Sequence, residues 1–159
     1  MSYEGSTGEA SGVYVEAGTP DLTGPTGTWR FVAPGSMTRR QFGLFRRDIA
    51  PRGGGPDPHF HRTFSESFYV LSGTIRLYDG QRWVEATEGD FLHVPKGGIH
   101  AFSNNADEPA ALLILFAPGL ARERYFRALD EMGRSGVQLS DAEETAFLAS
   151  HDQYMVPAE

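Results

Sequence analysis

The feature that most restricts the fold of this chain is the regular interruption of residues 13–117 by glycine and proline. Short segments rich in aromatic and β-branched residues alternate there with turn residues. Roughly nine strands at such an even spacing are typical of a sandwich or barrel. Glycine and proline together make 29 of the 159 residues (19 + 10), which is about half as much again as their average usage. The sequence therefore predicts an all-β domain.

The clearest local signal within this region is the dipeptide Asp79-Gly80. It suits a two-residue hairpin turn between strands at 74–78 and 81–86. Such a turn would place Ile75 opposite Val84. The remaining strands are expected at residues 28–32, 41–49, 66–71, 90–94, 100–104 and 110–116.

The pattern changes on both sides of the strand-rich region. Residues 1–12 are small and polar, which indicates a flexible N-terminal arm without a secretory signal. Residues 13–117 are expected to form the barrel, and residues 118–159 a C-terminal helical segment packed on it. The first helix is expected at 120–132 with Gly133 as its C-terminal cap. A capping box at Ser140 and Glu143 opens a second helix that ends near residue 151.

Charge and composition exclude several classes of function. The formal net charge of −7 argues against a protein that binds nucleic acid through clustered basic side chains. The absence of cysteine excludes disulfides, thiolate zinc sites and cysteine nucleophiles. The longest apolar run, residues 110–117, is too short to cross a membrane. A cytoplasmic location is the simplest expectation.

Four side chains with metal-binding potential fall at informative positions. His59 and His61 are two residues apart, so in an extended segment both rings project from one face. Glu66 follows after a short link, and His100 comes from a later strand. Three imidazoles and one carboxylate suit a divalent transition metal (iron, nickel, cobalt, manganese or zinc), and a six-coordinate ion would keep two positions open for chemistry. The alternative is a set of unrelated surface residues, but three of only five histidines lie in this pattern.

The spacing of these residues resembles the two motifs of the cupin superfamily. The first motif is carried by Gly53, His59, His61, Glu66 and Gly73, and the second by Gly89, Pro95, Gly97, His100 and Asn104. The resemblance implies a double-stranded β-helix, or jelly-roll barrel, with a metal held by His59, His61, Glu66 and His100. From about residue 27 to Arg127 the chain is also similar to small bacterial single-domain cupins of the quercetin 2,3-dioxygenase-like group.

The substrate pocket is predicted from the alternation of side chains along the strands. Counting by twos from Glu66 places Phe68 and Val70 on the metal face, and counting from His100 places Phe102 there. These apolar side chains would favour a flat, aromatic small molecule. Arg46 and Arg47 alternate across a strand, so one could point inward and meet an anionic substrate. A pair facing the rim or the solvent is the simpler interpretation.

The resemblance favours a metal-dependent dioxygenase that acts on a flavonol-like or enolic compound with O2. Glu66 would accept the substrate proton as the catalytic base. One alternative is a non-redox cyclase, isomerase or lyase of the polyketide-cyclase kind, in which the ion acts as a Lewis acid. Another is a cupin that binds a small molecule without turning it over. Jelly-roll edge strands and an apolar outer sheet face also predict a homodimer.

Overall fold

The structure is a computed structural model that describes residues 2–157, in which the chain forms eleven strands and two helices. Residues 2–21 precede the first strand and are exposed. The strands are β1 (Leu22–Gly24), β2 (Gly27–Ala33), β3 (Gly43–Ile49), β4 (His59–Phe60), β5 (Ser65–Ser72), β6 (Thr74–Tyr78), β7 (Trp83–Thr87), β8 (Phe91–Val94), β9 (Ala101–Ser103), β10 (Ala110–Ala117) and β11 (Tyr154–Met155). The helices are α1 (Arg122–Ser135) and α2 (Asp141–Ser150).

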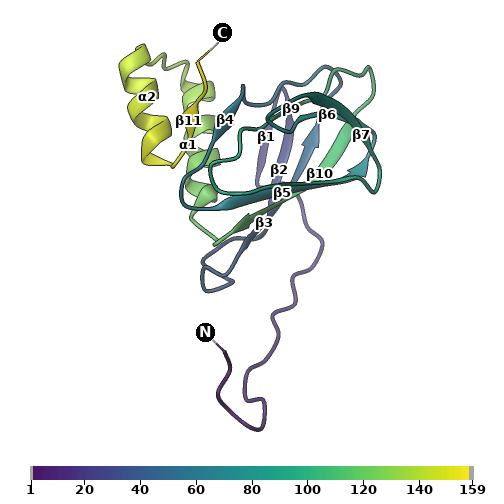
Figure 1. Ribbon diagram of the computed structural model, residues 1–159, viewed down its shortest axis with the longest axis vertical. Coiled ribbons are helices and arrows are strands. Elements are labelled where there is room, and N and C mark those ends of the chain that lie inside the picture. The colour runs from purple at the N-terminus through teal and green to yellow at the C-terminus, as the bar shows by residue number, and fades with distance from the viewer. Residues whose placement is uncertain (1, 158–159) are drawn as a thin grey trace.

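Two antiparallel sheets form the barrel, which lies beside the paired helices (Figure 1). The larger sheet has the strand order β1-β2-β3-β10-β5-β8, and the smaller has the order β7-β6-β9. Because β10 lies between β3 and β5, strands that are far apart in the sequence become neighbours. This arrangement confirms the all-β prediction and the double-stranded β-helix that the motifs implied.

The core lies between the two sheets and follows the alternation of side chains along each strand. On β3, residues Phe45, Arg47 and Ile49 are buried, while Arg46 between them is exposed. On β5, Phe68 and Val70 are completely buried. The hydrophobic cluster joins these side chains to Ile75 and Leu77 of β6 and to Phe102 of β9.

The chain passes from the larger sheet to the smaller at Gly73. This residue has a φ of 74°, a left-handed conformation that glycine adopts without steric cost. A Cβ atom there would also lie 2.5 Å from the carbonyl oxygen of Pro109. The turn therefore requires glycine for its backbone shape and its close packing, as expected for the last glycine of the first motif.

The hairpin at Asp79-Gly80 differs from the prediction. Tyr78 pairs with Trp83 and Ile75 pairs with Ala86, so the loop has four residues and the expected register is wrong by two. The cause is the Asp79 carboxylate, which accepts hydrogen bonds from the backbone N–H groups of Gln81 and Arg82 at 2.8 Å. These bonds stabilise a wider turn than the dipeptide alone indicates.

The two helices begin and end for identifiable reasons. Helix α1 continues through Gly133 and ends at Gly136, whose φ of 68° provides the left-handed cap, so the predicted cap at Gly133 is wrong. Helix α2 starts with the predicted capping box of Ser140 and Glu143. Among residues 2–157, no helix combines the length and apolar composition that a membrane-spanning helix needs.

Candidate metal centre

Four buried side chains meet inside the barrel: His59, His61, Glu66 and His100. Each offers one ligand atom, and these atoms all lie within 4.8 Å of one another. The Oε2 atom of Glu66 lies 3.0 Å from Nε2 of His61 and 2.9 Å from Nε2 of His100. All four residues are at most 5% exposed. The structure therefore brings together every ligand that the motif resemblance implied.

Short backbone pairings place these side chains. His59 and His100 form an antiparallel bridge, in which each backbone N–H donates to the other's carbonyl at 3.1 and 2.9 Å. The N–H of Gly97 donates to the carbonyl of His61 at 2.7 Å. Glu66 comes from β5, which lies between β10 and the edge strand β8 of the larger sheet, and it pairs there with Phe116 and Val94. His59 and Glu66 thus lie on strands, and backbone hydrogen bonds hold the segments of His61 and His100 against their neighbours.

The imidazole Nδ1 atoms all face backbone carbonyl oxygens. His59 donates to Asp57 at 2.8 Å, His61 to Asp152 at 2.6 Å and His100 to Gly98 at 3.0 Å. Because a carbonyl oxygen can only accept, Nδ1 carries the proton in each ring. The Nε2 atom of each ring then carries a lone pair that can bind a ligand inside the cluster. This orientation by a partner at the second nitrogen is typical of metal-binding histidines.

Electrostatics in the cluster are dominated by burial and by the Glu66 carboxylate. Burial lowers the pKa of His59 to about 3, and the nearby His100 ring adds to this effect, so His59 is neutral at physiological pH. Burial opposes ionisation of Glu66, but its close contacts with His100 and His61 outweigh this effect and lower the pKa of the carboxyl group. For His100, burial lowers the pKa, yet contact with Glu66 raises it more. The site therefore favours positive charge next to an ionised Glu66.

A divalent cation fits this donor set. With Nδ1 protonated, Nε2 of a neutral imidazole has only a lone pair and cannot donate a hydrogen bond to a carboxylate. A cation among the donor atoms removes that conflict. Two ligands that lie about 2.1 Å from one ion, at right angles, are about 3 Å apart. The observed separations of 2.9 and 3.0 Å agree with this value.

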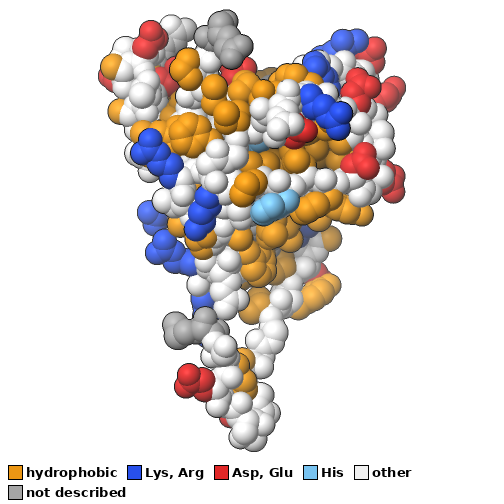
Figure 2. All heavy atoms as spheres, viewed as in Figure 1, with side chains coloured by type: hydrophobic (Ala, Val, Ile, Leu, Met, Phe, Trp, Pro, Cys, Tyr) orange, Lys and Arg blue, Asp and Glu red, His pale blue; other side chains and the backbone are white. Residues whose placement is uncertain are grey.

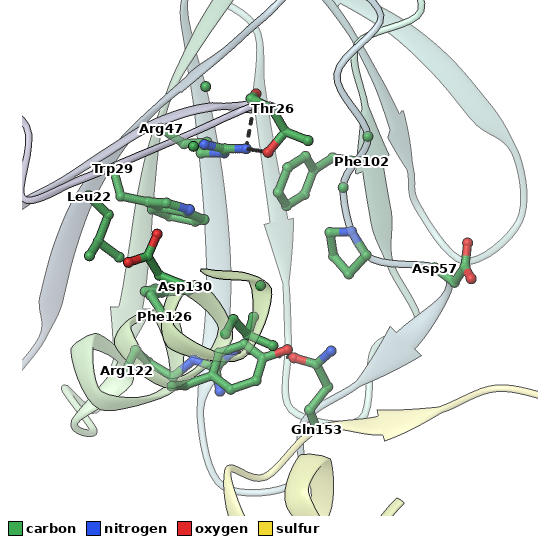
Figure 3. A pocket seen from close by; sticks show the side chains of 18 of the residues that line it. Leu22, Thr26, Trp29, Arg47, Asp57, Phe102, Arg122, Phe126, Asp130 and Gln153 are labelled. Carbon is green, nitrogen blue, oxygen red and sulfur yellow. Dashed lines mark hydrogen bonds between the residues drawn. The ribbon is translucent and has the colours of Figure 1, made fainter. Parts of the chain in front are cut away.

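A cavity of about 780 Å³ opens from the ligand cluster toward the helices. His59 and Glu66 are part of its wall, and Phe102 faces it from β9 (Figure 3). Phe68 and Val70 are completely buried in the core, and the residues that line the cavity include neither of them. Other lining side chains come from β1, β2, α1 and the tail, and they include Leu22, Trp29, Arg122, Tyr125, Phe126 and Gln153.

Two arginines in the cavity wall belong to the site as the structure shows it. Arg47 is only 5% exposed and points inward, so the solvent-facing interpretation of the Arg46-Arg47 pair is wrong for Arg47. Arg122, also 5% exposed, was missed by the sequence analysis. Its position on the same helix face as Tyr125 and Phe126 is the signal that could have revealed it, because a charged residue within an apolar stripe becomes buried.

Two further polar residues have structural roles. The amide of Asn104 donates to the carbonyls of Ala50 and Glu108, and its oxygen accepts from the N–H of Ala106, so it stabilises the turn that follows β9. His93 is exposed and forms a hydrogen bond with Ser67 at 2.9 Å. It is not part of the ligand cluster.

Comparison with known proteins identifies the domain family to which the central part of the chain is similar. Residues 45–116, from β3 to β10, match the cupin domain family. The chain carries a cupin domain. The matched segment contains all four clustered ligands. The cavity extends beyond it, because Trp29, Arg122 and Gln153 lie outside the matched residues.

Relatives of this cupin include larger proteins. Quercetin 2,3-dioxygenase from Bacillus subtilis (strain 168) is 31% identical over 102 residues, which are 64% of this chain and 29% of that protein. Germin-like protein 5-1 from Oryza sativa subsp. japonica is 40% identical over 74 residues, 42% of this chain and 32% of that protein. The chain thus matches about a third or less of the length of these relatives.

Solved structures support the fold. KdgF from Halomonas sp. superimposes with a TM-score of 0.59 at 15% sequence identity, covering 68% of this chain and 94% of that one. At this level of identity, the similarity concerns the barrel architecture and not the reaction.

Proposed function

We propose that this cupin is a metal-dependent dioxygenase that acts on an enolic or flavonol-like aromatic compound. The observation that carries the proposal is the convergence of three imidazole nitrogens and the Glu66 carboxylate within 4.8 Å, beside a cavity lined by aromatic side chains. The similarity to quercetin 2,3-dioxygenase supports this choice of reaction. A cavity of about 780 Å³ has room for a substrate of that size.

His59, His61, Glu66 and His100 would hold one divalent transition metal, with iron, nickel, cobalt, manganese and zinc all compatible with the donors. When bound, such an ion lowers the pKa of a coordinated hydroxyl group and provides a site for oxygen chemistry. The imidazoles are fixed through their Nδ1 hydrogen bonds, so they keep their orientation without the substrate.

Glu66 has a second role in the proposal as the proton acceptor. Both histidine contacts involve its Oε2 atom, and within residues 2–157 no side-chain or backbone donor bonds to Oε1. Glu66 is also part of the cavity wall. Oε1 is therefore free to accept the hydroxyl proton of a substrate that enters from the cavity. Phe102, across the cavity, would pack on the ring of such a substrate.

The test measures metal content and oxygen uptake together. Protein loaded separately with iron, nickel, cobalt and manganese is offered a panel of flavonols, and oxygen consumption is recorded with an electrode. We expect uptake with at least one ion and its loss in Glu66→Gln. His93→Ala is the matched control, because it removes an imidazole outside the cluster and should keep both the metal and the activity.

The competing reactions give different results in the same experiment. Turnover with zinc under anaerobic conditions would identify a non-redox cyclase, isomerase or lyase and contradict the dioxygenase. A ligand that binds tightly and is never converted would identify a binding protein. A lack of oxygen uptake with every ion and every flavonol would also refute the proposal.

The proposal includes self-association as a homodimer. The outer face of the larger sheet exposes apolar side chains on neighbouring strands, with Tyr69 directly opposite Phe91 and with Leu115 on the adjacent β10. Figure 2 shows hydrophobic side chains gathered in the middle of one face of the molecule. The four-residue strand β8 forms an edge of this sheet. A second copy of the chain would cover both the apolar face and the edge.

A further inference from the structure

Arg47 is a buried cation whose role the metal centre does not explain. Its guanidinium lies in the cavity wall, where Nη2 donates to the carbonyl and hydroxyl oxygens of Thr26 at 3.2 and 2.8 Å and Nη1 to the carbonyl of Thr28 at 3.3 Å. These three bonds use three of its five N–H donors. The remaining two donors have no partner among residues 2–157.

The charge of Arg47 is likewise unpaired inside the barrel. Burial lowers its pKa to about 10, opposed by the nearby Asp48, so the group stays protonated at neutral pH. Asp48 itself bonds to Arg46 on the outer face. Asp130, another acid that lines the cavity, bonds to Arg134 at 2.8 Å. Within the described residues, no carboxylate lies within 4.0 Å of the Arg47 guanidinium.

The other buried arginine has a different environment. Arg122 is surrounded by four aromatic rings, at 4.3 to 5.5 Å, and it donates to His151 and Gln153. Burial lowers the pKa of Arg122, and the negative charge of Glu66 partly opposes this shift. Glu66 is therefore the acid whose charge acts most on Arg122. The acid that acts on Arg47, at the opposite end of the cavity in Figure 3, is Asp48, which already pairs with Arg46 on the outer face.

Flat aromatic surfaces flank Arg47. The Trp29 ring lies 5.1 Å from its guanidinium carbon and stacks on Phe126 with ring centroids 4.0 Å apart. Phe102 lies across the cavity from Trp29 (Figure 3). A buried guanidinium with two unpaired N–H donors, on Nε and Nη1, favours an anionic group such as a carboxylate, and the aromatic side chains near it suit a conjugated body.

We propose that the cavity binds a planar organic carboxylate, with the carboxylate at Arg47 and the conjugated body between Trp29 and Phe102. This inference rests on the proposed function for the location of the reacting end, which would lie at Glu66 and the metal. It narrows the substrate class from flavonol-like compounds in general to those that carry an acidic group. The bound anion would compensate the charge that the protein leaves unpaired.

The test compares an acid with its neutral amide. 6-Hydroxy-2-naphthoate and 6-hydroxy-2-naphthamide share one ring system with the hydroxyl group at the far end from the carboxyl group, and they differ in charge. Their affinities are measured by calorimetry on metal-loaded protein and on chelator-treated protein. We expect the wild type to bind the acid about tenfold more tightly in both forms, as charge-assisted hydrogen bonds require. Arg47→Gln should reduce this preference to about twofold or less. Arg46→Gln removes the same charge from the outer face and should retain the preference.

The inference is wrong if the wild type binds the acid no more tightly than the amide, or if it binds neither compound. It is also wrong if Arg47→Gln keeps the full preference. The wild-type comparison tests the inference even where the Gln variant fails to fold. Arg47→Lys keeps the positive charge but not the guanidinium donors, so it should retain part of the preference. Because no turnover is needed, acid preference without any oxygen uptake would refute only the proposed dioxygenase. Turnover of neutral flavonols without acid preference would refute only this inference.

Discussion

Gly54 and Gly55 are neighbours in the loop before β4, but they differ in what surrounds them. A Cβ atom on Gly54 would have no atom within 4 Å. A Cβ atom on Gly55 would lie 2.1 Å from the carbonyl oxygen of Phe102 and 2.8 Å from its ring. Gly55 therefore allows the loop to approach β9 closely, just before the chain reaches His59.

This difference predicts unequal effects of two alanine substitutions. Gly55→Ala should destabilise the protein by about 1–3 kcal/mol, because a backbone carbonyl cannot move aside as a side chain could. Gly54→Ala should change the stability by less than about 0.5 kcal/mol. Chemical denaturation of the metal-free proteins measures both values. Equal stability of the two variants would show that the loop does not pack on Phe102 as described.

At the residue scale, the ligands could be predicted from the sequence, whereas the orientation of Arg47 was misjudged. The spacing of His59, His61 and Glu66 is local, so the sequence itself carries it. Arg47 is two residues from both Phe45 and Ile49, so the alternation along the strand places it on the buried face. Arginine side chains are usually exposed to solvent, however, and this preference favours the opposite interpretation. The partners that make burial possible are Thr26 and Thr28, about twenty residues earlier.

The short tail after α2 is the element that connects the C-terminus to the metal centre. Strand β11 pairs with β4, so Tyr154 lies opposite Phe60 and Met155 opposite His59. The Asp152 carbonyl accepts the Nδ1 proton of His61. The Asp152 carboxylate accepts from the N–H groups of Arg62 and Thr63 and from the Thr63 hydroxyl, at 2.6 to 3.2 Å. The tail thus fixes both the backbone and the ring of this ligand segment.

Replacement of Asp152 should therefore weaken metal binding without removing a ligand. Asp152→Ala loses the carboxylate contacts to the ligand loop and disfavours the left-handed backbone, where φ is 56°. We expect metal affinity to fall about 10- to 100-fold, the usual effect of removing an outer partner of a ligand. Asp152→Asn, which tolerates that backbone and keeps one oxygen, should lose less.

Competition with a chelator measures these affinities. Glu131→Ala removes an exposed carboxylate from α1 and serves as the charge control, with an affinity expected to equal that of the wild type. Wild-type affinity in Asp152→Ala would mean that β4 holds His61 in place without help from the tail.

At the element scale, the sequence predicts the elements whose signals are local. The capping box at Ser140 and Glu143 is one example, because the interacting residues are three apart. Strand β11 is the opposite case, since two residues carry no periodicity and their partner β4 lies more than ninety residues earlier. The hairpin register was wrong because the Asp79 side chain, and not the Asp-Gly backbone preference alone, determines the turn.

For the whole molecule, the cupin match and the cavity cover different parts of the chain. Residues 45–116 contain the four metal ligands, which explains why motif spacing identifies the centre. The far wall of the cavity comes from Trp29 before this segment and from Arg122 to Gln153 after it. The residues proposed to select the substrate come from both parts, since Arg47 and Phe102 lie inside the match and Trp29 lies outside it, and none of the three is among the residues that define the two motifs.

The outer face of the larger sheet gives the last prediction. Phe91 is 63% exposed and Tyr69 is 44% exposed, and the two side chains lie opposite each other on neighbouring strands. An apolar pair at a sheet edge is stabilised when a second copy covers it, so we expect a dimer by light scattering after gel filtration. Phe91→Glu should convert it to a monomer, because the interface would bury an unpaired charge. Val137→Glu changes an apolar side chain of similar exposure in the loop between the helices and should leave the dimer intact. A wild-type monomer at about 100 μM, well above the Kd of a stable dimer, would contradict the prediction.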